Sequence, residues 1–136
     1  MTGSYVFDAN AVLDFVEAGP GIHKVDQLLH AAARRQVTVL VSVMNLGEVF
    51  YWLWQKRSEE QARYTLDGLC RLPIQIVPVD LPQALKAGQL KALHKIPYVD
   101  CIAAALALQY HATLVTADRD FEKLGRHFPV LWITRQ

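Results

Sequence analysis

Acidic side chains at five separated positions are the residues of this sequence best suited to chemistry: Asp8, Glu48, Asp100, Asp118 and Asp120. Two carboxylates about 4 Å apart repel each other by roughly 4 kcal/mol at an effective dielectric constant near 20, so acids that converge on one point need a positive partner. Arg119 is the only basic residue inside the short motifs that contain these acids. A divalent cation is therefore the simpler partner, and oxygen ligands without His or Cys favour Mg²⁺ or Mn²⁺ over Zn²⁺.

Each acid also has a purely structural interpretation. Asp100 suits the N-cap or the first turn of a helix, where the helix dipole favours a negative charge. Asp8 could cap a short helix immediately after it, and the last two acids could be caps within a loop at residues 117–121. Glu48 fits such an interpretation least, because its neighbours are apolar and a buried carboxylate is costly unless it is paired or coordinated. An exposed position on a helix remains open for Glu48.

The elements that must position these acids are indicated by the apolar pattern. Short β-prone runs occur at residues 5–7, 37–41, 74–77, 113–116 and 131–133, and helical patterns occur at residues 23–35, 43–57, 59–71, 99–110 and from residue 81 onward. Apolar strands that alternate with helices predict an α/β fold, with a mainly parallel sheet of four to five strands between two helical layers. Because parallel strands end at the same edge, acids that come after different strands become neighbours there. Glu48 would lie about 9 Å along its helix from the end of the second strand.

Composition limits the possible classes of function. The chain has 136 residues, of which 52% are hydrophobic and 20% charged, and it is expected to form a single domain over residues 1–136. A formal net charge of +1 excludes nucleic-acid binding by bulk charge, so a phosphate partner needs a local basic patch or a bound cation. Cys70 and Cys101 have neither disulfide-framework nor zinc spacing. With no signal-peptide pattern and no apolar run of membrane-spanning length, we expect a soluble, cytoplasmic protein.

Four sequence segments together resemble a known family. They are Val6-Phe7-Asp8-Ala9-Asn10, Ser42 through Gly47-Glu48-Val49, Asp100-Cys101-Ile102-Ala103-Ala104, and Leu114-Val115-Thr116-Ala117-Asp118-Arg119-Asp120-Phe121. In this order and at these distances, the segments resemble PIN-domain ribonucleases, specifically the VapC-type toxins of toxin–antitoxin pairs. Each segment alone is weak evidence for this family, since an Asp after a strand is common.

The resemblance implies a structure, an activity and a set of partners. It implies a three-layer α/β/α sandwich, an Mg²⁺- or Mn²⁺-dependent endoribonuclease that cleaves RNA, a homodimer, and neutralisation by a cognate VapB-type antitoxin. Asp8 and Asp100 would be the principal metal ligands, with Glu48 and Asp118 completing the shell or positioning a water. Asp120 would be a substitute or more distant ligand. Asn10 and Thr116 match polar positions that orient the acids in this family.

Basic residues near these motifs are candidates for binding RNA phosphates, chiefly Arg119 and Lys95. Further candidates are Lys56-Arg57, Arg34-Arg35 and Lys91, and a solvated surface charge is the alternative for each of them.

The helix predicted at residues 43–57 carries four large aromatic side chains: Phe50, Tyr51, Trp52 and Trp54. They are too many for one buried stripe, which favours a dimer or antitoxin interface. The alternative is a core helix covered by the segment at residues 59–71.

Two other functions remain open. A receiver-like signalling domain would also gather acids and Mg²⁺ at this edge, with Asp80 as phosphoacceptor and Thr116 as the switch hydroxyl. Asp80 precedes Leu81-Pro82, however, and reads better as a helix cap. The second alternative is a catalytically silent binding module with the PIN fold, against which the intact set of acids argues.

Overall fold

A five-stranded sheet forms the centre of the computed structural model, which describes residues 3–134. Its strands are β1 (Ser4–Phe7), β2 (Thr38–Ser42), β3 (Gln75–Val77), β4 (Thr113–Thr116) and β5 (Val130–Trp132). All four strand pairs are parallel, and the order is β3-β2-β1-β4-β5. Phe7, the last residue of β1, is in register with Val41 on one side and Val115 on the other. The carboxyl ends of β1, β2 and β4 therefore meet at one edge.

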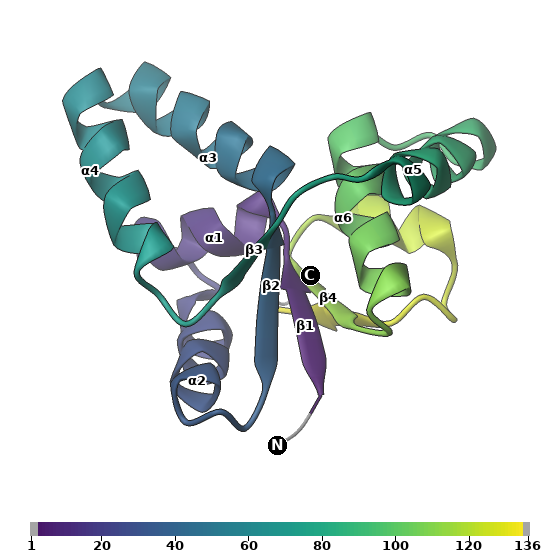
Figure 1. Ribbon diagram of the computed structural model, residues 1–136, viewed down its shortest axis with the longest axis horizontal. Coiled ribbons are helices and arrows are strands. Elements are labelled where there is room, and N and C mark those ends of the chain that lie inside the picture. Colours follow the sequence, from purple (N-terminus) through teal and green to yellow (C-terminus); the bar gives the residue numbers. More distant parts are fainter. Residues whose placement is uncertain (1–2, 135–136) are drawn as a thin grey trace.

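Helices cover both faces of the sheet. They are α1 (Ala9–Val16), α2 (Ile22–Ala33), α3 (Val43–Lys56), α4 (Glu59–Cys70), α5 (Leu81–Leu93) and α6 (Tyr98–Gln109). Figure 1 shows α1, α2 and α4 on one side of the strands and α5 and α6 on the other. The strand residues alternate between two cores: Phe7 packs with the α1–α4 layer, and Val6 packs with the α5–α6 layer. Burial on both faces explains why the strands read as continuous apolar runs.

Several helices begin at residues whose side chains accept a backbone N–H. Ser42 accepts the N–H of Met44 at 3.2 Å at the start of α3. Asp80 accepts the N–H of Gln83 at 2.9 Å at the start of α5. These caps satisfy donors that an α-helix leaves unpaired in its first turn.

The predicted α/β fold and three-layer arrangement are confirmed, and the predicted elements match the structure to within one or two residues. One difference concerns the chain after β4, where a 3₁₀ helix, η1 (Arg119–Leu124), replaces the loop considered for residues 117–121. A 3₁₀ helix of this length carries no apolar periodicity that a sequence pattern could detect. No helix within residues 3–134 has both the length and the apolar character needed to cross a membrane.

Candidate active site at the carboxyl edge of the sheet

Asp8 lies at the centre of this edge, between the end of β1 and the start of α1. The residue is only 3% exposed, and both carboxylate oxygens have donors: Oδ1 accepts the N–H of Ala11 at 2.9 Å, and Oδ2 accepts the hydroxyl of Thr116. Asp8 is thus an N-cap, as one interpretation of the sequence held. Burial raises the pKa of Asp8 to about 7, and the charges of Asp100 and Asp118 contribute to this rise.

Thr116 connects Asp8 to the last acidic motif. The Oγ1 atom that donates to Asp8 also accepts the N–H of Asp118 at 2.9 Å, and Oδ1 of Asp118 accepts the N–H of Asp120 at 2.9 Å. On the other side of the turn, Oδ1 of Asn10 accepts the N–H of Ala117 at 2.9 Å. Thr116 and Asn10, the two residues expected to orient the acids, therefore both accept backbone N–H groups of the segment between β4 and η1. Asp118 also caps η1.

Asp100 lies in the first turn of α6, as the sequence pattern suggested, but it is not the cap of that helix. The N-cap is Pro97, and α6 begins without a side-chain capping bond. Burial raises the pKa of Asp100 to about 7, and the negative charges of Asp118, Glu48 and Asp120 add to this rise. Asp100 thus lies within electrostatic reach of acids from two other segments of the chain.

Glu48 is half-buried on α3, and a buried neighbour holds its carboxylate. Nδ2 of Asn45 donates to Oε1 of Glu48 at 3.0 Å. Burial raises the pKa of Glu48, whereas the bond from Asn45 opposes that rise. Asn45 is 0% exposed, and its Oδ1 atom has no hydrogen-bond partner among residues 3–134. Asn45 was not predicted from the sequence; the available signal was a polar residue one turn before Glu48 on an otherwise apolar helix.

These carboxylates fit a hard divalent cation bound largely through water. Within residues 3–134, no three His, Cys, Asp or Glu side chains are placed to hold an ion by themselves. Mg²⁺ is usually bound through one or two carboxylates and retained waters, which is the chemistry that Asp8 and Asp100 offer. Each oxygen of Asp8 keeps a free lone pair beside its one hydrogen bond. Two acids with pKa values near 7 also indicate that a positive charge would stabilise their ionised forms.

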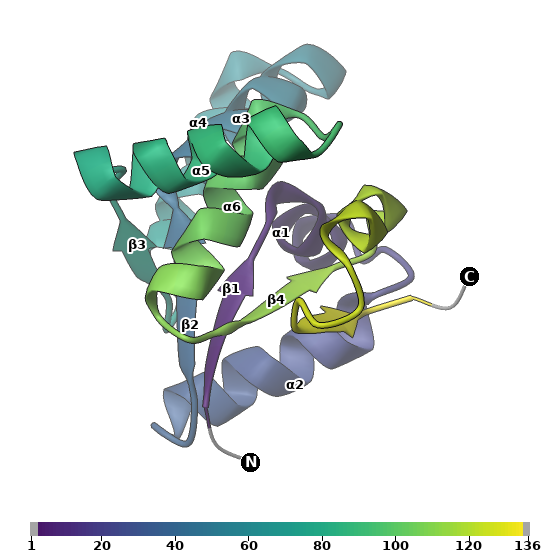
Figure 2. The ribbon, with the colours of Figure 1, turned by 90° about the vertical axis from the view of Figure 1, so that its right-hand side faces the viewer.

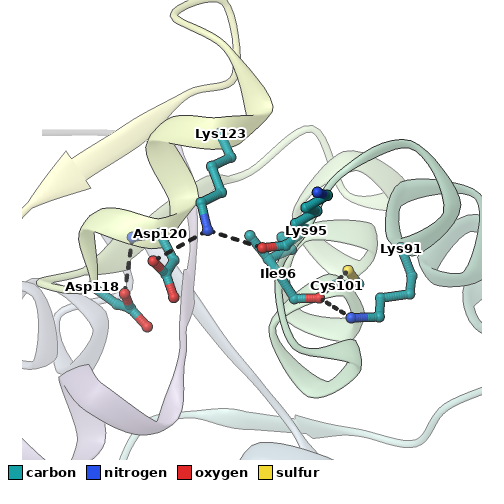
Figure 3. Close-up of polar contacts among 7 residues, drawn as sticks. All are labelled: Lys91, Lys95, Ile96, Cys101, Asp118, Asp120 and Lys123. Carbon is teal, nitrogen blue, oxygen red and sulfur yellow. Dashed lines mark hydrogen bonds and ion pairs between the residues drawn. The ribbon is translucent and has the colours of Figure 1, made fainter.

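Lys123 is the cation that the structure brings to the last acidic motif. Its Nζ atom lies 3.7 Å from Oδ1 of Asp120 and donates to the backbone oxygen of Lys95 at 3.0 Å. Figure 3 shows this ammonium between η1 and the loop that precedes α6. Lys123 was not predicted from the sequence, although a charge pair three residues apart was a usable signal.

Arg119 and Lys95, the two basic residues expected to bind RNA phosphates, differ from each other in their surroundings. Nη2 of Arg119 donates to the backbone oxygen of Thr134 at 3.0 Å, and its Cζ atom lies 4.2 Å from the centroid of the Trp132 ring. Arg119 would have to leave these partners to bind a phosphate, so its role stays a prediction. The Lys95 side chain is exposed, and Figure 3 shows it extending away from Asp120.

The further basic candidates mostly lie elsewhere. Arg57 pairs with Glu17 at 2.7 Å. Arg34 and Arg35 lie between α2 and β2, at the amino edge of the sheet and opposite the acids, so the structure does not support them as ligands of a phosphate there. Lys91 donates from Nζ to the backbone oxygen of Ile96 at 2.8 Å, beside Cys101 (Figure 3).

The receiver-like alternative does not match this geometry. Asp80 comes after the edge strand β3, two strands away from β1, and its carboxylate caps α5. The hydroxyl of Thr116 is already bonded to Asp8 and to the backbone of Asp118.

Comparison with known proteins agrees with the fold and the order of these elements. The sequence model of the PIN domain matches residues 5–127. The sequence matches none of the curated proteins with which it was compared.

Three solved structures illustrate the likeness in three dimensions. VapBC2 from Rickettsia felis, bound to a DNA fragment from its promoter, has a TM-score of 0.75 at 19% identity and covers 94% of this chain and 97% of its own. DNA-bound VapBC from Salmonella typhimurium has a TM-score of 0.74 at 19% identity, covering 96% and 98%. Mycobacterium tuberculosis VapC20, a sarcin–ricin loop cleaving toxin, has a TM-score of 0.71 at 17% identity, covering 89% and 95%. At these identities the likeness to the solved structures shows the fold alone. The match of the PIN-domain sequence model shows the family, so this chain belongs to the PIN-domain family.

Proposed function

We propose that this protein is a metal-dependent endoribonuclease of the VapC type, a cytoplasmic toxin that cleaves RNA and is neutralised by a cognate antitoxin. The observation that carries the proposal is the mutual electrostatic effect of acids from four separate segments. Burial is the main cause of the raised pKa values of Asp100 and Asp8. The charges of Asp118, Glu48 and Asp120 add to the rise for Asp100, and those of Asp100 and Asp118 add to the rise for Asp8. Such a concentration of negative charge is unfavourable unless the site serves to bind a cation.

The proposed chemistry divides the acids by their surroundings. A bound Mg²⁺ or Mn²⁺ would supply Lewis acidity at the scissile phosphate and a water of lowered pKa. Asp8, held at both oxygens, and Asp100, which does no capping, would be the principal ligands. Glu48 and Asp118 would complete the coordination or orient the attacking water. Asp120, which lies beside Lys123, is the more distant acid.

Two surfaces support the proposed protein partners. On α3, Phe50 and Trp52 pack partly against the core, but Tyr51 is 54% and Trp54 42% exposed. The apolar side chains Leu81, Leu85 and Leu93 of α5 are also exposed. Exposed apolar groups of this size commonly mark protein interfaces. The Rickettsia and Salmonella neighbours are described as VapBC assemblies, which favours an antitoxin as one partner; a homodimer would use a second surface.

The direct test is RNA cleavage by the purified protein with Mg²⁺, with Mn²⁺ and with a chelator. We expect cleavage only when a metal is present, and its loss in Asp8→Asn and in Asp100→Asn. Asp67→Asn, an exposed acid on α4, is the matched control and should retain activity. Full activity of both Asp8→Asn and Asp100→Asn would overturn the proposed metal site. No cleavage by the wild type with either metal would overturn the nuclease and favour the silent binding module.

A further inference from the structure

An open cavity of about 440 Å³ lies between η1, the segment after it, and the edge strand β5. In Figure 2 these segments are the yellow part of the chain, beside β4. The side chains that line the cavity include Phe121, Glu122, Arg126, Phe128, Val130 and Trp132. Its volume is in the range of pockets that bind small molecules. None of these residues has a part in the proposed metal chemistry.

Two structural elements connect the cavity to the candidate active site: η1, and the edge strand β5, which pairs with β4. Trp132 is in register with Thr116, so one parallel-strand spacing of about 4.8 Å separates Trp132 from the residue that holds Asp8 and Asp118. The other wall is η1, in which Phe121 and Glu122 come directly after Asp120. A strand of RNA whose phosphate lies at the acids would therefore have a neighbouring nucleotide close to this cavity.

Trp132 is an aromatic residue of the lining whose ring and backbone both have partners. The guanidinium of Arg119 lies 4.2 Å from the centroid of its ring, and Nζ of Lys24 donates to its backbone oxygen at 2.8 Å. Phe128 is a second, partly buried aromatic residue in the lining, and Phe121 is 1% exposed. A planar group that enters the cavity would thus meet the partly buried rings of Trp132 and Phe128.

The polar groups of the cavity suit a nucleotide. Arg126 is exposed and can pair with a phosphate, and Glu122 is exposed and can accept hydrogen bonds from the amino group of a base. Single-stranded RNA is bound mainly through bases that stack on aromatic side chains, with nearby cations on the backbone.

We propose that this cavity binds one nucleobase of single-stranded RNA next to the cleaved phosphate, with the base against Trp132 and Phe128 and a phosphate near Arg126. The inference rests on the proposed ribonuclease function, because it is the acids that bring RNA to this edge. It adds a substrate subsite and its residues to that function.

The binding test uses the indole N–H signals of the three tryptophans in a ¹⁵N–¹H spectrum of the whole protein in chelator. Trp132→Phe assigns the Trp132 signal, and the signals of Trp52 and Trp54 on α3 serve as internal controls. The probes are the four ribonucleoside 5′-monophosphates and inorganic phosphate. We expect at least one nucleotide to shift the Trp132 signal saturably while phosphate does not. No saturable shift with any nucleotide, or the same shift with phosphate alone, overturns the base site.

Variants connect this binding to catalysis. Phe128→Ala and Arg126→Ala should each weaken nucleotide binding and raise KM for RNA roughly tenfold with little change in kcat. Arg71→Ala, an exposed arginine at the end of α4, should change neither value. An unchanged KM in both cavity variants, with undisturbed Trp52 and Trp54 signals, contradicts the proposal.

The two proposals fail in distinguishable ways. Asp8→Asn should abolish cleavage without altering the Trp132 titration. A failed titration in an active nuclease overturns the base site alone, whereas a wild-type protein that cleaves no RNA overturns the proposed function.

Discussion

The hydroxyl of Thr116 donates to Asp8 across the β1–β4 strand pair, and the same oxygen accepts the backbone N–H of Asp118. One side chain thereby fixes two acids that are far apart in the sequence. Thr116 is completely buried, so no water competes for these bonds. This arrangement explains how a buried carboxylate keeps one orientation in a site whose charges repel each other.

Replacement of Thr116 by Val tests this role, because Val has nearly the same shape but cannot donate. We expect Thr116→Val to weaken Mn²⁺ binding and cleavage by about 10- to 100-fold, the usual effect of losing a residue that orients a metal ligand. The unpaired Asp8 oxygen and Asp118 N–H should also lower the free energy of unfolding by about 1–3 kcal/mol. Calorimetric Mn²⁺ titration and chemical denaturation measure the two effects. Thr116→Ser keeps the hydroxyl and should retain most of the metal binding, cleavage and stability of the wild type. Equal losses in Thr116→Ser and Thr116→Val would contradict the role of the hydrogen bond.

The raised pKa of Asp100 predicts how stability depends on pH in the metal-free protein. Its pKa is raised from the ordinary 3.8 to about 7, so between these values the folded state binds more protons than the unfolded state. The free energy of unfolding should therefore fall as the pH rises from about 4 through about 7. Thermal denaturation in chelator across this range measures the fall. Asp8 has the same direction of shift and should contribute in the same sense.

Asp100→Asn separates this contribution from the other titrating groups. The variant should be less sensitive to pH than the wild type, whereas Asp67→Asn should behave like the wild type. Because metal binding needs ionised carboxylates, Mn²⁺ should raise Tm more at pH 8 than at pH 5. A wild-type Tm that rises steadily from pH 4 to pH 8 in chelator would show that the two acids do not titrate as described.

Replacement of Asn45 should affect RNA cleavage much more than it affects the stability of the fold. Its Oδ1 atom is buried without a partner among residues 3–134, while its Nδ2 atom holds Glu48. In Asn45→Ala, removal of the unpaired acceptor and a better helix propensity should offset the small cavity that is left, so the free energy of unfolding should change by less than about 1 kcal/mol. Cleavage should fall at least tenfold, because Glu48 loses its orientation. Gln55→Ala, at an exposed position of α3, is the control; a large loss of stability with unchanged kcat would assign Asn45 to the core instead.

The elements and the positions of the acids relative to them could be predicted from the sequence, because both depend on local patterns; the roles of the acids stay a prediction. A run such as Val6-Phe7 before Asp8 specifies a buried strand and places a carboxylate at its carboxyl end. The neighbourhood of Trp132 and Thr116 could not be predicted in this way, because it arises from the register of β4 and β5. Neither could the direction of Arg119, since a long side chain in an acidic motif can turn toward the acids or, as here, toward an aromatic ring.

Lys123 and Arg119 are both basic residues of η1, and the structure predicts different effects for them. The Lys123 ammonium is half-exposed next to Asp120 and can contact a phosphate at the acids. Lys123→Met should raise KM for RNA several-fold and lower the salt dependence of binding by about one phosphate contact. Arg119→Met should instead lower Tm, because it removes the contacts with Trp132 and Thr134 that hold β5, and should leave the salt dependence unchanged.

Lys86→Met, an exposed lysine on α5, controls for loss of a positive charge. Fluorescence-anisotropy titrations of inactive Asp8→Asn protein with labelled RNA at several salt concentrations distinguish the two cases. A smaller salt dependence in Arg119→Met but not in Lys123→Met would assign the phosphate contact to Arg119, and would require its guanidinium to leave Trp132 when RNA binds.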